Sequence, residues 1–139
     1  MFQQMMNVNW LAVLVSAVAF MIVGFIWYTV FAKPWSDYTG WTRAKVAKVP
    51  QNQMVVSYVV TFVTALVTSF VLADFLKLLQ SGDVGSAVLG AVMVWLGFTE
   101  APGTSSFAFE RRPWGLLAIV VGNTLVSMLV GAVILTLWK

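Results

Sequence analysis

The chain has 139 residues, of which 60% are hydrophobic and only 9% are charged, with a net charge of +3 and a mean hydropathy of +0.90. Soluble domains are about 45–50% apolar and about 25% charged, so this composition excludes an ordinary water-soluble protein and predicts one integral membrane domain over residues 1–139. The absence of Cys and His excludes disulfides, thiolate chemistry and zinc or haem sites built from these residues. We therefore expect no metal and no cofactor.

The first predicted membrane helix covers residues 8–31, an apolar run followed at once by Lys33 and long enough to cross a bilayer, which takes about 20 residues. In the following segment, residues 33–50, aromatic residues recur every three positions among basic ones. This pattern predicts an interfacial segment at the depth of the lipid headgroups. Thr42 is the expected cap of a short second turn, which Pro50 ends.

The second predicted helix covers residues 54–79, and its hydroxyl residues follow a helical period. They are separated by four, three and four positions, which places them on one face; they are Ser57, Thr61, Thr64 and Thr68. Small hydroxyl residues let helix backbones approach closely in lipid, so we interpret this face as a packing surface. A hydroxyl-lined permeation path is the alternative.

The third predicted helix covers residues 84–101 and is short. Only sixteen residues separate Asp83 from Glu100, and they would cover about 24 Å of a hydrocarbon core of about 30 Å. Glu100 is therefore expected inside the membrane, on the same face as Gly90 and Gly97. Pro102 removes a backbone donor and predicts a break in the helix, followed by a folded-in loop over residues 102–112.

The fourth predicted helix covers residues 114–138, with Pro113 in a position that suits a helix start. Thr124, Ser127 and Gly131 share a face that we expect to pack against other helices, and Asn123 lies beside them. The chain is thus predicted to be an all-α polytopic membrane protein of four transmembrane helices, with the third short and broken near Pro102.

Basic residues near the predicted helices favour one side of the membrane. Six lie in the two longer loops, namely Lys33, Arg43, Lys45, Lys48, Arg111 and Arg112, whereas only Lys77 and Lys139 lie on the other side. The positive-inside rule then places the loops in the cytoplasm and both termini outside. Because the basic residues stay in short loops and form no extended domain, nucleic-acid binding is not expected.

Several short motifs resemble a family of small bacterial four-helix membrane proteins of unknown function. They are Gly24-Phe25-Ile26-Trp27-Tyr28 in the first helix, Lys33-Pro34-Trp35, Trp95-Leu96-Gly97-Phe98, and Phe109-Glu110-Arg111-Arg112-Pro113 before the fourth helix. The resemblance covers nearly the whole chain. It implies a multi-pass protein of the bacterial cytoplasmic membrane, and it brings no catalytic residues with it.

A charge inside a bilayer costs roughly 2.5–3.5 kcal/mol on insertion scales, so some interaction must offset the charge of Glu100. We consider three alternative hypotheses for it. In the first, Glu100 pairs with Arg111 or Arg112, beside Glu110, and orients the fourth helix. In the second, Glu100 is a proton or cation site in a polar cavity lined by Thr104, Ser105, Ser106 and Asn123. In the third, a lipid or apolar ligand lies between helices with the arginines on its headgroup.

The first hypothesis corresponds to a structural or accessory membrane protein, and the second to a small transporter or channel component. No enzymatic activity is expected, since no His is present as a base and a Ser with a carboxylate alone is a weak nucleophilic set. Membrane lipids are the expected partners, and the small-residue faces favour a homo-oligomer, most simply a dimer. A small-molecule ligand is not identified.

Overall fold

The computed structural model describes residues 3 and 6–138, so Lys139, which entered the charge count above, lies outside the described residues. Four helices are long and apolar enough to cross a membrane, which confirms the predicted all-α fold of a four-helix membrane protein. They are α2 (Trp10–Val30), α5 (Gln51–Leu78), a bent helix over Val84–Phe109, and α8 (Trp114–Leu137). Two short helices, α3 (Ala32–Thr39) and α4 (Arg43–Ala47), connect α2 to α5.

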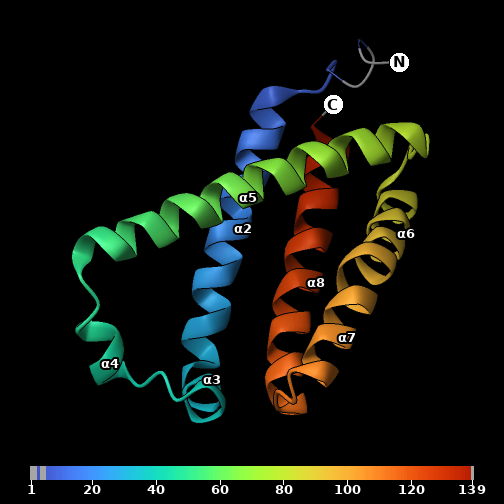
Figure 1. The fold of residues 1–139 in the computed structure, drawn as a ribbon. Helices are drawn as coiled ribbons and strands as arrows, with labels where there is room; N and C mark the ends of the chain where they lie inside the picture. The colour runs from blue at the N-terminus through green and yellow to red at the C-terminus, as the bar shows by residue number, and fades with distance from the viewer. Residues whose placement is uncertain (1–2, 4–5, 139) are drawn as a thin grey trace.

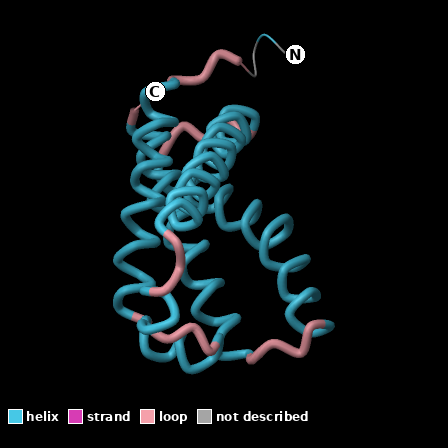
Figure 2. Tube along the Cα trace, turned by 60° about the vertical axis from the view of Figure 1, so that its left-hand side comes forward, coloured by secondary structure: helices cyan, strands magenta, loops and turns pink. Residues whose placement is uncertain are grey.

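Helices α2 and α8 lie side by side, and the bent helix packs on the other side of α8 (Figure 1). Helix α5 crosses the others obliquely. Its C-terminal half contacts α2, while its N-terminal half diverges from the bundle toward α4 (Figure 1). The described residues form helices and loops only (Figure 2). The divergence of α5 leaves space between α2, α5 and α8.

Side-chain caps fix the starts of three helices. Asn9 Oδ1 accepts hydrogen bonds from the backbone of Leu11 and Ala12 at the start of α2, both at 3.1 Å. Thr42 caps α4 as predicted, since its hydroxyl accepts from the backbone N–H of Lys45. Asp83 caps the third helix, and hydrogen bonds from the side chain and backbone of Ser86 lower the pKa of this carboxyl group. Capping of this kind satisfies donors that the helix itself leaves unpaired.

The third span consists of α6 (Val84–Val94), a π-helical turn η1 (Trp95–Glu100) and α7 (Ala101–Phe109). The regular α-helix is thus interrupted just before Pro102, but the chain stays helical up to Phe109. The predicted folded-in loop over residues 102–112 is therefore wrong for residues 102–109, which are helical. In the π turn, the Ala101 N–H bonds to the Leu96 carbonyl, five residues back. Pro102 then falls in the first turn of α7, where its missing donor is tolerated. The span is 26 residues long, not short.

The packing face of α5 is rotated by one residue from the predicted one. The four predicted hydroxyl residues are exposed, and each donates to a carbonyl of its own helix. The buried residues of α5 are Ala65, Ser69, Leu72, Asp74 and Leu76, and Ser69 donates to Ser16 of α2 at 3.0 Å. Larger aliphatic side chains, together with Ala65 and Ser69, therefore form the contact with α2.

Close helix contacts occur at four glycines, one of which, Gly115 of α8, lies directly against the Tyr38 ring of α3. A Cβ at Gly131 would lie 2.6 Å from Phe20, and a Cβ at Gly90 would lie 2.8 Å from Leu79. Gly122, which the sequence did not single out, lies directly against the Trp27 ring. Gly97 is different, since a Cβ there would meet nothing within 4 Å. The absence of a side chain thus matters at Gly90, Gly115, Gly122 and Gly131 and not at Gly97.

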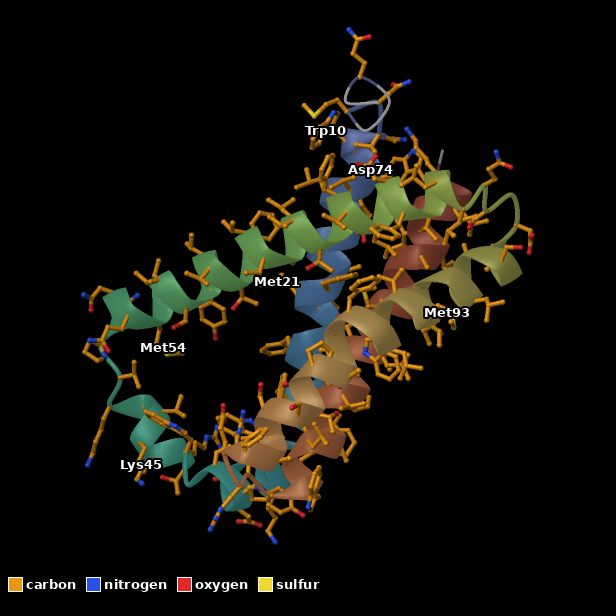
Figure 3. All side chains as sticks on the ribbon, turned by 45° about the vertical axis from the view of Figure 1, so that its right-hand side comes forward. Trp10, Met21, Lys45, Met54, Asp74 and Met93 are labelled. Atoms are coloured by element: carbon orange, nitrogen blue, oxygen red, sulfur yellow. The ribbon has the colours of Figure 1, made fainter. Side chains whose placement is uncertain are left out.

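The two basic loops lie at the same end of the molecule, away from the described part of the N-terminal segment (Figure 1). Lys45 marks this end, and Trp10 lies at the opposite one (Figure 3). This placement agrees with the grouping of basic residues in the charge count. Which end faces the cytoplasm stays a prediction of the positive-inside rule.

Candidate ligand chamber and its buried carboxylate

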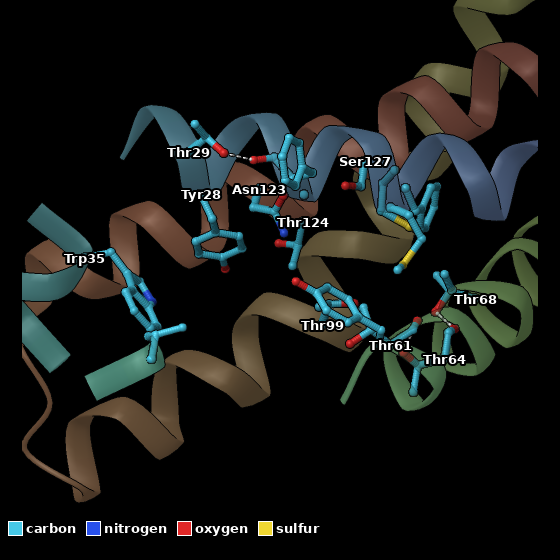
Figure 4. A pocket seen from close by; sticks show the side chains of 18 residues that line it. Tyr28, Thr29, Trp35, Thr61, Thr64, Thr68, Thr99, Asn123, Thr124 and Ser127 are labelled. Carbon is cyan, nitrogen blue, oxygen red and sulfur yellow. Dashed lines mark hydrogen bonds between the residues drawn. The ribbon is translucent and has the colours of Figure 1, made fainter. Parts of the chain in front are cut away.

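A cavity of about 780 Å³ fills the space that the divergence of α5 leaves; we call it the chamber. Its eighteen lining residues come from α2, α3, α4, α5, η1 and α8, and none of them is an Asp, Glu, Lys or Arg (Figure 4). Aromatic and Met side chains supply the apolar part, including Phe20, Phe25, Tyr28, Met21 and Met128. Its volume lies within the range of about 300–1,000 Å³ for small-molecule sites.

One wall of the chamber carries hydroxyl groups from α5. Thr61, Thr64 and Thr68 face Thr99, Thr124 and Ser127 across the cavity (Figure 4). The α5 hydroxyl protons already point to carbonyls of their own helix, so toward the cavity these groups offer acceptor lone pairs rather than donors. Three of the four residues that we predicted to pack against another helix therefore line a cavity within this chain, and Ser57 does not.

Asn123 also lines the chamber, as part of the predicted polar lining. Its Oδ1 atom is buried and has no hydrogen-bond partner among the described residues. Buried polar atoms in native proteins are almost always paired. Asn123 Oδ1 has almost no accessible surface, so a ligand donor in the chamber reaches this acceptor only if the side chain turns.

Glu100 lies behind this wall, in a short hydrogen-bonded chain. Its Oε1 atom is 2.7 Å from the Thr124 hydroxyl, which in turn accepts from the Trp95 indole N–H at 2.9 Å. Glu100 and Trp95 are both buried, with exposed fractions of 8% and 9%. Thr124 itself lines the chamber. The carboxyl group is thus connected to the chamber through one hydroxyl.

The predicted pairing of Glu100 with Arg111 or Arg112 is absent from the described part of the chain. Arg112 instead pairs with Glu110 at 3.6 Å, where both side chains are largely exposed, and its guanidinium lies over the Phe107 ring. Continuation of the helix explains the difference. Helix α7 runs on to Phe109, nine residues beyond Glu100, and at 1.5 Å per residue it places the turn that carries Arg111 and Arg112 about 13 Å away along its axis.

The three hydroxyls that we predicted to surround Glu100 lie elsewhere. Thr104, Ser105 and Ser106 are on α7 and do not line the chamber. The Ser106 hydroxyl donates to the Pro102 carbonyl of its own helix. Because residues 101–109 form a helix and not a loop, these side chains do not fold back around the carboxylate.

A second cavity adjoins the chamber at the end that carries the basic loops; we call it the basic pocket. It measures about 630 Å³ and shares Tyr28, Thr29, Trp35 and Val46 with the chamber. Two cations line it, Lys33 at the start of α3 and Arg43 at the start of α4. The chamber thus borders a cationic pocket at the expected depth of lipid headgroups.

Sequence reasoning missed the basic pocket because it assigned any headgroup contact to Arg111 and Arg112. The spacing of Lys33 and Arg43 gives no sign that two short helices bring them to one cavity. Sequence reasoning also missed the role of Trp95. The available signal was that an indole N–H buried in a bilayer must find a hydrogen-bond partner.

A family model described as "Protein of unknown function (DUF1761)" matches residues 11–136. No curated protein and no solved structure matches the chain.

Proposed function

The chain belongs to the DUF1761 family of proteins of unknown function, and we propose that it is a non-enzymatic membrane protein that binds an amphipathic, lipid-like molecule. The apolar part of the ligand occupies the chamber, and an anionic headgroup occupies the basic pocket. The observation that carries this proposal is that an uncharged cavity borders, and shares four lining residues with, a cavity lined by Lys33 and Arg43.

The charges of the two cavities support this division of the ligand. No side chain in the chamber would repel or attract a charge, so only an uncharged ligand portion fits there at low cost. Lys33 and Arg43 offer several N–H donors to the oxygens of a phosphate, sulfonate or carboxylate group. Membrane lipids combine these two features.

Selectivity over bulk lipid has to come from the polar contacts. Lipid tails are as apolar as the chamber wall, so transfer of a chain from bilayer to chamber brings little hydrophobic gain. The basic pocket is the position where a ligand gains hydrogen bonds that the bilayer does not provide. It is therefore expected to determine which amphiphile binds.

A fluorescent amphiphile tests this proposal on the purified protein in nanodiscs. The probe is a dodecyl sulfonate with a terminal pyrene, and its emission anisotropy is followed as protein is added. We expect saturable binding of about one probe per chain. Thr61→Trp, which fills the chamber from α5, should weaken binding at least tenfold, or about 1.4 kcal/mol.

Val60→Trp is the matched control, because Val60 is the neighbouring residue on α5 but is 55% exposed and does not line the chamber. It should leave probe affinity unchanged. A pyrene-tipped dodecanol, which has a hydroxyl group in place of the sulfonate, measures the contribution of the headgroup to binding. Its binding should be weaker than that of the sulfonate, and only the sulfonate should lose affinity as salt screens Lys33 and Arg43. Equal losses for Thr61→Trp and Val60→Trp would contradict the proposal.

The predicted homodimer, the bacterial inner-membrane location and the outside position of both termini stay predictions. Support for a second copy comes from α5, whose N-terminal half carries exposed apolar residues such as Val55, Val56 and Val59 without a neighbouring helix. Exposed apolar residues also face lipid in membrane proteins. Cross-linking in native membranes would show whether these residues contact a second copy of the chain or lipid.

A further inference from the structure

The hydroxyl of Ser127 lies in the chamber wall without a hydrogen-bond partner among the described residues. The residue is only 6% exposed, and it lines the chamber from α8 (Figure 4). Its Oγ atom keeps some accessible surface, since the unpaired side-chain atoms that are fully enclosed in the described chain are Asn123 Oδ1 and Thr136 Oγ1. A group in the chamber can therefore reach Ser127 Oγ without movement of a helix.

Most other hydroxyl groups of the chamber wall are already paired. Serine and threonine in helices commonly donate to a carbonyl of the preceding turn. Three hydroxyl groups of α5 do so, those of Thr61, Thr64 and Thr68. The Thr124 hydroxyl is paired with Glu100. Ser127 makes no such bond with its own helix or with another described residue, so its proton is free to bind a ligand.

The two sides of the chamber complement each other as donors and acceptors. On one side Ser127 offers an O–H donor, and so does Thr99, whose hydroxyl also forms no hydrogen bond with a described residue. On the other side the paired hydroxyl groups of α5 offer lone pairs but no protons. A ligand hydroxyl between the two sides can accept from Ser127 and donate to α5. A carbonyl group could only accept, and an alkyl chain could do neither.

Ser127 lies far from the basic pocket along the bundle. Helices α2 and α8 run in opposite directions (Figure 1), and Asn123, one turn before Ser127, lies 3.9 Å from a Cβ placed at Gly24. Gly24 precedes Val30, the end of α2, by six residues, and Lys33 of the basic pocket follows directly. Six residues and one further turn correspond to about 14 Å. A ligand with its headgroup in the basic pocket therefore reaches Ser127 with the middle of its chain.

We propose that the ligand is an anionic amphiphile with a hydroxyl group in the middle of its apolar chain, and that Ser127 donates a hydrogen bond to this group. The proposal rests on the proposed function, which places the headgroup in the basic pocket. A hydroxyl in the middle of a chain has no partner in the core of a bilayer, whereas the chamber supplies both a donor and acceptors. This group therefore favours the chamber over bulk lipid, which an alkyl chain alone does not.

Three sulfonates of equal chain length test this proposal on the purified protein in nanodiscs. They are octadecyl sulfonate, its derivative with a hydroxyl group in the middle of the chain, and the isomer with the hydroxyl group beside the sulfonate. Each competes with the pyrene-tipped dodecyl sulfonate, and its concentration is measured as a mole fraction of the nanodisc lipid. We expect the mid-chain isomer to displace the probe at a mole fraction roughly fivefold lower than the other two, as one net hydrogen bond would give.

Ser127→Ala tests whether this preference comes from the Ser127 hydroxyl. Alanine removes the donor, so the two hydroxylated isomers should then bind equally. Because the change deletes an unpaired polar group, it should not impair folding. Ser57→Ala is the matched control, since Ser57 is also a helical serine in a membrane span but does not line the chamber. This variant should keep the preference for the mid-chain isomer.

The outcomes separate this inference from the proposed function. Equal affinity of the two isomers for the wild-type protein would overturn the inference and leave the proposed function intact, provided that both displace the probe. A preference that survives Ser127→Ala, or that is lost equally in Ser57→Ala, would also overturn it. If none of the three sulfonates displaced the probe, the proposed function itself would be wrong and the inference would fall with it.

Discussion

Thr124→Val is expected to lower the free energy of unfolding by about 2–4 kcal/mol, the largest effect that we predict for a nearly isosteric change. The hydroxyl links the Trp95 indole to the Glu100 carboxyl, and both of these groups are buried. Valine would leave two buried polar groups without a partner, and each unpaired group costs about 1–3 kcal/mol. Unfolding of the purified protein in mixed micelles measures the loss.

Two further variants serve as controls for this result. Thr124→Ser keeps the hydroxyl and should recover most of the stability. Thr104→Val makes the same Thr-to-Val change on α7, outside the hydrogen-bonded chain, and should change stability by less than about 0.5 kcal/mol. If Thr104→Val destabilised the protein as much as Thr124→Val, the loss would not come from the Glu100 network.

The second large effect is expected from Gly122→Ala, which should destabilise the protein by about 1–3 kcal/mol. A Cβ at Gly122 would lie 2.8 Å from Trp27 Cη2, a separation at which one of the two must move. The Trp27 ring is not free to move, because its N–H donates to the Ile119 carbonyl at 2.9 Å. The added methyl group therefore forces α2 and α8 apart or breaks this hydrogen bond.

Gly103→Ala is the matched control, since Gly103 is also helical but a Cβ there would meet nothing within 4 Å. Alanine is a better helix former than glycine, so this variant should keep or slightly raise the stability. Both variants are compared by thermal unfolding under the same conditions. A Gly122→Ala protein as stable as the wild type would show that α2 and α8 do not pack as closely as described.

Hydropathy predicted the four spans because a bilayer requires about 20 consecutive apolar residues and leaves few alternatives to a helix. It could not predict the path of the third span. A proline in a helix normally predicts a break, and the π turn at Trp95–Glu100, which places Pro102 in a first turn, depends on backbone hydrogen bonds that composition does not encode. That one difference moved Arg111 and Arg112 away from Glu100.

The candidate site was predictable in part. The sequence placed Glu100 inside the membrane because of its position in an apolar run, and it placed Thr124 and Asn123 on a shared region of the fourth helix. It did not bring Glu100 and Thr124 together, since the contact depends on how η1 packs against α8. The hydroxyl face of α5 was recognised, but whether such a face meets a helix or a cavity depends on the tilt of α5, which periodicity does not determine.

The chamber itself is tested most directly by photolabelling with a dodecyl sulfonate that carries a diazirine in the middle of its chain. Labelled positions are mapped by mass spectrometry of peptides, with and without an excess of unlabelled dodecyl sulfonate. We predict competed labelling at chamber residues such as Met21, Thr61 and Met128. Labelling confined to outward-facing residues such as Leu89 and Met93, and unaffected by the competitor, would contradict a ligand chamber between α2, α5 and α8.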